Sequence, residues 1–234
     1  DIGDGILSIS PLPANASAPS APNGVMVHLF EWKWTDIQKE CTYLSQKGYT
    51  AVQVSPPMEH VIPVVDQGDP NNDFPWWVRY QAASYSLATS RSGSLAEFQA
   101  MVNTCSGLGV DIFVDAIVNH TTGVGSGTGT AGTTYSEYSY PGPDGQYNSS
   151  NFHHCGTNGG DGGNPNGNNI TNYANRYEVQ NCELVNLADL DTSQPVVQAE
   201  IRAYLQTLLN MGVKGFRLDA AKHMFTHDIT GIVA

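Results

Sequence analysis

The chain has 234 residues, and 40% of them are hydrophobic, a composition typical of a globular protein that buries a sizeable core. Its 22 acidic and 10 basic residues give a formal net charge of -12 at pH 7, which disfavours binding to nucleic acid and to anionic lipid surfaces. No apolar run is long enough to span a bilayer. We therefore expect neither a nucleic-acid partner nor a membrane partner.

The first part of the chain alternates short apolar strands with an amphipathic helix. After a Pro-, Ala- and Ser-rich arm at 1–23, residues 25–30 form a first predicted strand, and a helix runs from near Trp34 to Gly48. Residues 50–54 are a second strand, which ends at consecutive prolines because proline cannot donate to a sheet. These segments predict one β-α unit followed by the strand of the next.

A long loop at 58–92 leads to a second helix. Ser94 and Glu97 have the spacing of a capping box, which marks the start of that helix. Residues 109–118 are the third predicted strand, and Asn119-His120 stands at its C-terminal edge.

The next segment, 121–188, is rich in Gly, Ser and Asn and is far longer than ordinary loops, so we predict a small inserted domain there. A further helix opens at Pro195 and ends before Gly212, and the fourth strand is 213–218. Strands that alternate with helices predict a parallel sheet covered by helices, with the carboxyl ends of all strands at one face.

The fourth strand ends in Gly215-Phe-Arg217-Leu-Asp219, and Lys222 and His223 follow. The polar residues would then lie at the carboxyl end of a buried strand, where α/β barrels keep their active sites, so Asp219 is the candidate catalytic centre. An alternative for this stretch by itself is an internal ion pair followed by a solvated turn. The residues predicted to reach the shared face are Asn119, His120, Asp189 and Asp219.

The chain has four cysteines, an even number without the C-x-x-C spacing of a zinc site, which favours disulfides and allows three pairings. They are Cys41, Cys105, Cys155 and Cys182. Tripeptides with the N-glycosylation pattern begin at Asn15, Asn148 and Asn169. We expect a secreted, extracellular protein.

Three motifs follow one another along the chain: Asp115-Ala-Ile-Val-Asn119-His120, Leu187-Ala-Asp189-Leu190, and 215–223. In order and spacing they resemble the motifs of the α-amylase family, most closely those of the animal-type and related bacterial α-amylases. Gln53-Val-Ser-Pro-Pro57 and Trp76-Trp77-x-Arg79-Tyr80-Gln81 add to the resemblance, which runs from about Val25 to the end.

The resemblance implies an α/β fold, a (β/α)₈ TIM barrel with an irregular calcium-binding domain inserted after its third strand. The barrel would comprise 24–120 and 189–234, and the insertion 121–188. Only the first four β/α units are then present, so we expect the remainder of the barrel from a missing or separate segment. Consecutive helices and the long insertion motivate a Cys41–Cys105 and a Cys155–Cys182 disulfide, and the resemblance supports the same pairing.

Retaining glycoside hydrolysis needs a carboxylate nucleophile and a second carboxyl about 5 Å away as the acid/base. The resemblance makes Asp219 the nucleophile, with Arg217 favouring its ionised form. It implies substrate contacts, by hydrogen bonds to sugar hydroxyls or stacking on sugar rings, for Trp77, Tyr80, Gln81, His120, Arg217, Lys222 and His223. The alternatives are core packing for the tryptophans, a core or surface position for each histidine, and a solvated charge for the lysine.

Calcium prefers oxygen ligands from carboxylates, amides and backbone carbonyls. The resemblance maps such a site onto Asn119, Asp189 and the carbonyls of Gln180 and His223, although animal enzymes tend to carry arginine at the Gln180 position. A chloride ion bound at Arg217 is also implied for one branch of the family.

The predicted function is endo-hydrolysis of α-1,4-glucosidic bonds in starch or glycogen, with maltooligosaccharides as the ligands. The family's general-acid glutamate and third carboxylate have no counterpart in these residues, so we expect the piece alone to be inactive. The alternatives are a related transglycosylase or α-glucosidase, and a non-catalytic calcium-dependent glucan-binding fragment.

Overall fold

The computed structural model describes residues 24–62, 75–123, 125–141, 146–155 and 167–234. The predicted arm at 1–23 lies outside these residues. Within the part of the chain that is described, no helix combines the length and the apolar character that a membrane span requires.

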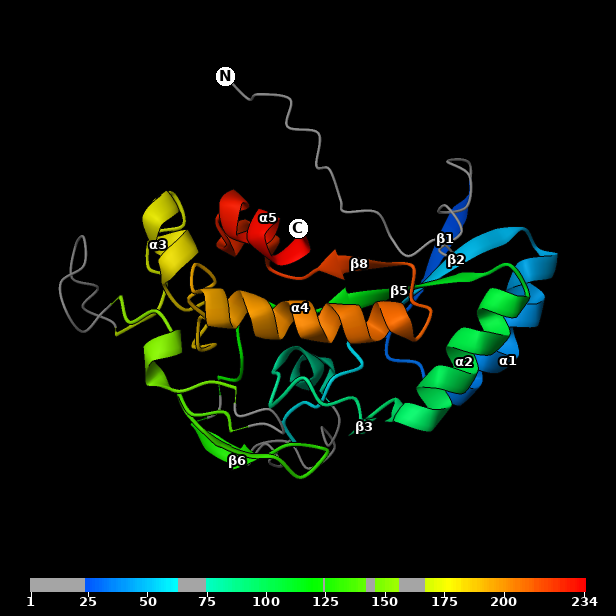
Figure 1. Ribbon diagram of the computed structural model, residues 1–234, viewed down its shortest axis with the longest axis horizontal. Helices are drawn as coiled ribbons and strands as arrows, with labels where there is room; N and C mark the ends of the chain where they lie inside the picture. The colour runs from blue at the N-terminus through cyan, green and yellow to red at the C-terminus, as the bar shows by residue number, and fades with distance from the viewer. Residues whose placement is uncertain (1–23, 63–74, 124, 142–145, 156–166) are drawn as a thin grey trace, which may run out of the picture.

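The centre of the molecule is a four-stranded sheet in the order β1-β2-β5-β8, and every neighbouring pair is parallel. Figure 1 shows β5 and β8 running in the same direction through the middle of the molecule. The strands are β1 (Val25–Leu29), β2 (Tyr49–Val54), β5 (Asp111–Ala116) and β8 (Gly215–Leu218). Since neighbours in the sheet are also successive strands of the chain's β-α repeat, all four carboxyl ends lie at one edge, as predicted.

Two strands begin later than the sequence predicts, because the residues expected to start them are hydrogen-bonded to the end of the preceding helix. The amide of Val110 donates to Cys105 O at 2.9 Å, and the amide of Val213 donates to Leu208 O at 3.2 Å. Gly109 has φ +75° and Gly212 has φ +102°, the left-handed conformation that closes a helix and that glycine adopts without strain. The strands therefore begin only at Asp111 and Gly215.

Helices pack their apolar faces onto the sheet, with α1 and α2 side by side in Figure 1 and α4 lengthwise over the strands. The capping box predicted for α2 is confirmed: the amide of Glu97 donates to Ser94 Oγ at 3.3 Å, and the amide of Ser94 donates to Glu97 Oε2 at 2.7 Å. The helices are α1 (Trp34–Gln46), α2 (Leu95–Gly107), α3 (Arg176–Asn181), α4 (Pro195–Asn210) and α5 (Thr226–Val233).

Two disulfides have the pairing that the sequence analysis predicts. Cys41 on α1 is joined to Cys105 on α2, with a Cα–Cα distance of 5.2 Å. Cys155 is joined to Cys182 with a Cα–Cα distance of 5.5 Å, and this pair forms a small core of its own with Ile170 and Val179. The second disulfide therefore closes the outer part of the segment 121–188.

The segment predicted as a loop at 58–92 is only partly a loop. Its described residues include the 3₁₀ helix η1 (Trp76–Tyr80) and the short strand β3 (Thr89–Ser90), which pairs with β4 (Gly93–Ser94). The segment 121–188 contributes β6 (Ser126–Thr128), β7 (Thr134–Ser136) and the 3₁₀ helix η2 (Ser149–Asn151), and η3 (Ala221–His223) follows β8.

Glu59 links these two irregular segments from a fully buried position. Its Oε1 accepts hydrogen bonds from the amides of Ala131 at 2.8 Å and Thr133 at 3.0 Å, in the turn between β6 and β7. Its Oε2 accepts from Ser84 Oγ at 2.5 Å. The carboxylate therefore holds the β6–β7 turn against the segment that follows β2.

The buried His60 predicts a loss of stability in acid. Its Nδ1 lies 2.8 Å from the carbonyl of Val61 and therefore donates, so Nε2 accepts from the amide of Arg91 at 3.1 Å. Burial lowers the pKa of His60 from 6.5 to about 4. The unfolded chain then binds a proton at His60 more tightly than the folded chain does. The stability that neutral His60 contributes is therefore complete above the unfolded pKa of 6.5 and is lost as the pH falls from 6.5 towards the folded pKa of about 4.

We expect His60 to account for about 3 kcal/mol of the free energy of unfolding lost between about pH 7.5 and about pH 4. Urea unfolding of His60→Gln measures this, since its pH dependence should be flatter by that amount whatever its stability at neutral pH. His227→Gln is the control, because the His227 side chain is 75% exposed. An unchanged slope in His60→Gln contradicts the prediction.

Candidate active site

The candidate site lies at the carboxyl ends of β5 and β8. Asn119 and His120 come shortly after β5, and His120 forms an antiparallel β-bridge with Asp189. The amide of Leu190 donates to Asn119 O at 2.9 Å, which fixes the 188–190 segment against the same edge. Asp219 directly follows β8, and its amide donates to Ala116 O at 3.0 Å. The structure thus brings the predicted polar residues of three segments to one edge of the sheet.

Arg217 joins two carboxylates at the centre of the site. Its Nη1 lies 2.7 Å from Asp219 Oδ1, and 2.7 Å and 2.9 Å from the two carboxylate oxygens of Asp115. Burial acts to lower the pKa of Arg217, but its hydrogen bonds and charge pairing with the two aspartates outweigh burial and raise it. Arg217 is therefore a permanent cation that holds Asp219 in place.

Asp115 opens the first of the family motifs, but sequence reasoning gave it no role in the site. Its side chain is 1% exposed, and burial raises its pKa although the hydrogen bonds from Arg217 and Tyr80 oppose that shift. The register of the sheet places Asp115 in the site: Asp115 pairs directly with Arg217 across β5 and β8, so both side chains lie on the same face of the sheet. That register becomes visible only once the order of the strands is known.

The two predicted substrate-binding histidines are both buried and hydrogen-bonded. His120 Nε2 donates to Tyr80 O at 3.0 Å, and its Nδ1 has no hydrogen-bond partner among the described residues. His223 Nδ1 donates to Val179 O at 2.8 Å. Burial lowers the pKa of each histidine. Each ring is thus neutral at pH 7, and the second nitrogen of each ring carries no proton and is a hydrogen-bond acceptor.

The predicted aromatic residues lie on η1. Trp76 and Trp77 are 56% and 43% exposed, and Trp76 meets the ring of Tyr80 edge to face at a centroid distance of 5.6 Å. The hydroxyl of Tyr80 donates to Asp115 Oδ2 at 2.9 Å, which connects η1 to the carboxylate pair. Gln81 Oε1 accepts from the amide of Gly123 at 3.0 Å, so the side-chain amide nitrogen is the group that remains for a ligand.

Lys222 lies with its Nζ 5.7 Å from the centroid of the Tyr173 ring. Tyr173 is 53% exposed and belongs to the segment before α3, a position that sequence reasoning missed because no local pattern marks it. An exposed ring beside an ammonium group offers a stacking surface and a hydrogen-bond donor together.

The predicted calcium ligands form two pairs in the structure. Asn119 Nδ2 donates to Asp189 Oδ1 at 3.0 Å, and both side chains are buried. Gln180 Nε2 donates to the carbonyl of Met224 at 2.9 Å, which places the end of α3 beside η3 and His223. Within the described ranges no group of three or more His, Cys, Asp or Glu side chains could hold a metal ion.

The predicted set nevertheless fits calcium, because it needs one carboxylate, one amide oxygen and two carbonyl oxygens rather than a carboxylate cluster. Burial raises the pKa of Asp189 to about 6, although hydrogen bonding and charge pairing with His153 oppose the shift. A divalent cation would offset the cost of keeping this carboxylate ionised in a buried position. A half-turn of the Asn119 amide would present its oxygen in place of its nitrogen.

The residues around Arg217 do not by themselves fit a chloride ion. Arg217 carries one positive charge and already lies against the carboxylates of Asp115 and Asp219, 2.7 Å from each. Two carboxylates and one guanidinium leave a net negative charge, which repels an anion. We derive no role for chloride from this arrangement.

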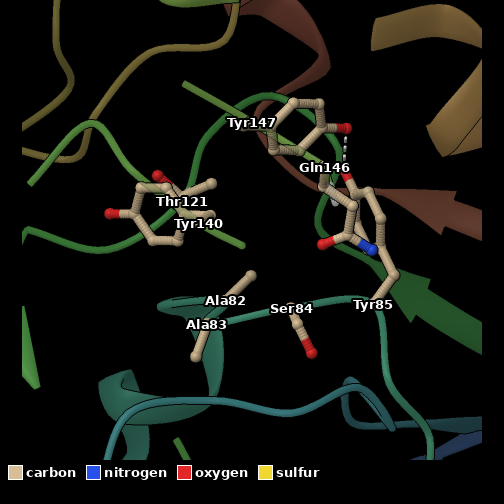
Figure 2. A pocket seen from close by; sticks show the side chains of 8 residues that line it. All are labelled: Ala82, Ala83, Ser84, Tyr85, Thr121, Tyr140, Gln146 and Tyr147. Atoms are coloured by element: carbon tan, nitrogen blue, oxygen red, sulfur yellow. Dashed lines mark hydrogen bonds between the residues drawn. The ribbon is translucent and has the colours of Figure 1, made fainter. Parts of the chain in front are cut away.

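A small pocket lies between the segment 82–85 and the tyrosines Tyr140 and Tyr147, beside Thr121 (Figure 2). Figure 2 shows the rings of Tyr85 and Tyr147 closing one side of it. The lining includes neither Asp219 nor Arg217, and its other members include Ala82 and Ala83. The pocket therefore belongs to the packing between these segments and not to the candidate site.

Comparison with known proteins places these motifs in a family. The chain is 48% identical over 232 residues to an alpha-amylase of Thermomonospora curvata, covering 97% of this chain and 35% of that protein. It is 42% identical over 223 residues to the pancreatic alpha-amylase of Sus scrofa, covering 92% of this chain and 41% of that protein. The chain thus spans about two fifths of the length of these relatives.

A solved structure of an alpha-amylase I variant from Eisenia fetida, in complex with maltohexaose, matches with a TM-score of 0.80 and 46% identity. The match covers 89% of this chain and 40% of that one. Together with the parallel order of β1, β2, β5 and β8, this confirms the TIM-barrel fold, of which the described strands form part.

The protein-family model described as "Alpha amylase, catalytic domain" matches residues 33–230 of this chain. That range contains every motif on which the resemblance rested, and it includes Asp115, Asp189, Arg217 and Asp219. The chain belongs to the alpha-amylase catalytic-domain family.

Proposed function

We propose that the protein of which this chain is a part hydrolyses internal α-1,4-glucosidic bonds of starch or glycogen with retention of configuration, and that Asp219 is its nucleophile. The observation that carries the proposal is the position of Asp219 at the carboxyl end of β8, with Oδ1 2.7 Å from Arg217 Nη1. A guanidinium bound to one carboxylate oxygen fixes the orientation of the group and leaves the other oxygen for attack on the anomeric carbon.

The surrounding residues suit a carbohydrate ligand. Trp77 on η1 and Tyr173 beside Lys222 have exposed rings on which pyranose rings can stack. Gln81 and Lys222 supply N–H donors for sugar hydroxyls. The second ring nitrogen of His223 can accept a hydrogen bond from a sugar hydroxyl, which is the role we propose for it. In His120, Nε2 is bonded to Tyr80 O and Nδ1 is buried, so this arrangement does not offer the ring to a hydroxyl.

A retaining mechanism also needs a protonated carboxyl to assist the leaving group. The motifs of this chain supply the nucleophile and not that acid. The relatives are more than twice as long as the matched region, so we propose that the acid comes from the remaining part of the barrel. By itself the 234-residue piece would then be inactive.

We also propose that 121–188 is an inserted domain held to the barrel by calcium through Asn119, Asp189 and the carbonyls of Gln180 and His223. The barrel would comprise 24–120 and 189–234. Two disulfides, one in each part, support a secreted protein, because such bonds persist in oxidising surroundings.

Product analysis of the full-length protein acting on starch tests the proposal. Linear maltooligosaccharides whose new reducing ends are α-anomers, detected by NMR in the first minutes of reaction, are the expected result. Cyclic or transferred products would instead indicate a transglycosylase, and release of glucose alone would indicate an α-glucosidase. Glucan binding without hydrolysis by the full-length protein would indicate a binding module, and each of these outcomes contradicts the proposal.

A further inference from the structure

A largely buried group of three charged side chains contacts η1, the helix that carries the exposed tryptophans. The side chain of Arg79 is 1% exposed, and its Nη1 lies 3.4 Å from Glu31 Oε1. The other oxygen of Glu31 pairs with Nη2 of Arg91. We call Glu31, Arg79 and Arg91 the charge cluster. Removing charged side chains from water is costly, so a cluster of this kind raises the question of what it does.

The charge cluster holds η1 at two points. Arg91 Nη1 donates to the carbonyl of Pro75 at 3.1 Å, the residue directly before η1, while Arg79 lies within η1 itself. The Nη2 of Arg79 donates to Ser92 Oγ, and Ser92 Oγ donates to Trp32 O at 2.5 Å. The helix η1 is therefore tied to the connection between β1 and α1.

The same connection is tied to β2 and to the core. Glu31 has φ +67°, a left-handed conformation that costs a non-glycine residue about 1 kcal/mol, and its amide donates to Ser55 Oγ at 2.8 Å. The guanidinium carbon of Arg79 lies 5.8 Å from the ring centroid of Trp34, which is 1% exposed. Glu31 is thus held in one place, and it offers a fixed carboxylate to both arginines.

The helix η1 carries three aromatic residues, Trp76, Trp77 and Tyr80, and the last two are predicted to bind glucan. Phe30, the residue before Glu31, meets Trp76 at a centroid distance of 6.1 Å, and Trp76 meets Tyr80 at 5.6 Å. A 3₁₀ helix of five residues has poor internal hydrogen bonds, so side-chain contacts must set its orientation. Arg79 is the buried charged side chain of η1, and it lies between Trp77 and Tyr80 in sequence.

We propose that the charge cluster positions the aromatic residues of η1 for glucan binding. By fixing η1 against the β1–α1 connection, it holds Trp76, Trp77 and Tyr80 in the positions in which they form one binding surface for a glucan chain. Arg79 is a positioning residue in this scheme and does not touch the substrate. The inference rests on the proposed function. Since Tyr80 has its own hydrogen bond to Asp115, loss of the cluster impairs glucan binding more than the chemical step.

The test uses the full-length protein with Arg79→Lys and Glu31→Gln. Lysine keeps the charge of Arg79 but cannot reach Glu31 and Ser92 together, and glutamine keeps the shape of Glu31 without its charge. We expect KM for maltoheptaose to rise about tenfold in each variant while kcat changes by less than about threefold. Arg202→Lys is the control, because the exposed Arg202 of α4 contacts Gly231 O of α5 and not η1, and its replacement should leave both constants unchanged.

A purely structural role predicts a different pattern, in which the melting temperature falls and KM of the folded fraction stays at the parental value; that pattern overturns the inference. Glu31→Gln keeps the experiment decisive if Arg79→Lys fails to fold, because Glu31 is partly exposed and glutamine retains a side-chain oxygen that can accept hydrogen bonds from the arginines. Maltoheptaose binding is also measured by calorimetry in the Asp219→Asn background. Absence of binding to Asp219→Asn itself contradicts the proposed function, whereas equal binding with and without Glu31→Gln contradicts only the role of the cluster.

Discussion

Replacement of Asp219 by asparagine is expected to abolish hydrolysis in the full-length protein and to leave glucan binding nearly unchanged. Asparagine retains an oxygen that can accept the hydrogen bond from Arg217 Nη1, which lies 2.7 Å from Asp219 Oδ1. It lacks the negative charge and the nucleophilic oxygen that a covalent glycosyl intermediate requires. We expect kcat to fall by at least about 10⁴-fold, the order of effect seen when a nucleophile is removed.

The measurements are initial rates on starch and calorimetric titration with maltoheptaose. The dissociation constant should stay within about threefold of the parental value, because the shape of the site is retained. Asp36→Asn serves as the matched control, since Asp36 pairs with Lys39 at the surface of α1 and its loss should not change the rate. A rate for Asp219→Asn above about 1% of the parental rate would show that Asp219 is not the nucleophile.

Removal of calcium is expected to have the second largest effect, and its main effect is expected on the stability of the fold. Asp189 is 2% exposed, and it lies between Asn119 and His153. Without a cation, His153 is the basic group that contacts the buried Asp189 carboxylate among the described residues, and burial raises the pKa of Asp189 to about 6. Chelation should therefore loosen the contact between the 188–190 segment and the end of β5.

Limited proteolysis with and without chelator measures this effect, and new cleavages are expected first within 121–188. Asp189→Ala should weaken calcium binding at least about 10-fold and lower the melting temperature with calcium present, because it removes the one charged ligand. Asp191→Ala is the matched control. Asp191 also lies near His153, with Oδ1 3.3 Å from Nε2, and is not a proposed ligand. Identical cleavage patterns, or equal calcium affinity in Asp189→Ala and the parent, would refute the calcium site.

Elements with strong local signals could be predicted from the sequence. The capping box at Ser94 and Glu97 is a pattern of four residues, and its geometry is as expected. The helical period of α1 and α4, with glycine after each, depends on neighbours three and four residues apart. The apolar strands end in polar residues, and that feature by itself placed Asp219 and His120 at one edge of the sheet. These features are local because the contacts that produce them lie within one or two turns of the chain.

The tertiary structure decided which distant residues meet. Asp115 and Arg217 are 102 positions apart and became partners through the register of β5 and β8. Tyr80 reaches Asp115 across 35 positions, and Glu31 meets Arg79 and Arg91 through the packing of η1 on the β1–α1 connection. No spacing in the sequence encodes such pairs, since each depends on where a loop closes and how two elements pack. The position of Asp219 at the end of β8 was therefore predictable from one stretch of sequence, whereas the partners that hold it and the contacts that fix η1 were set by the packing of distant segments.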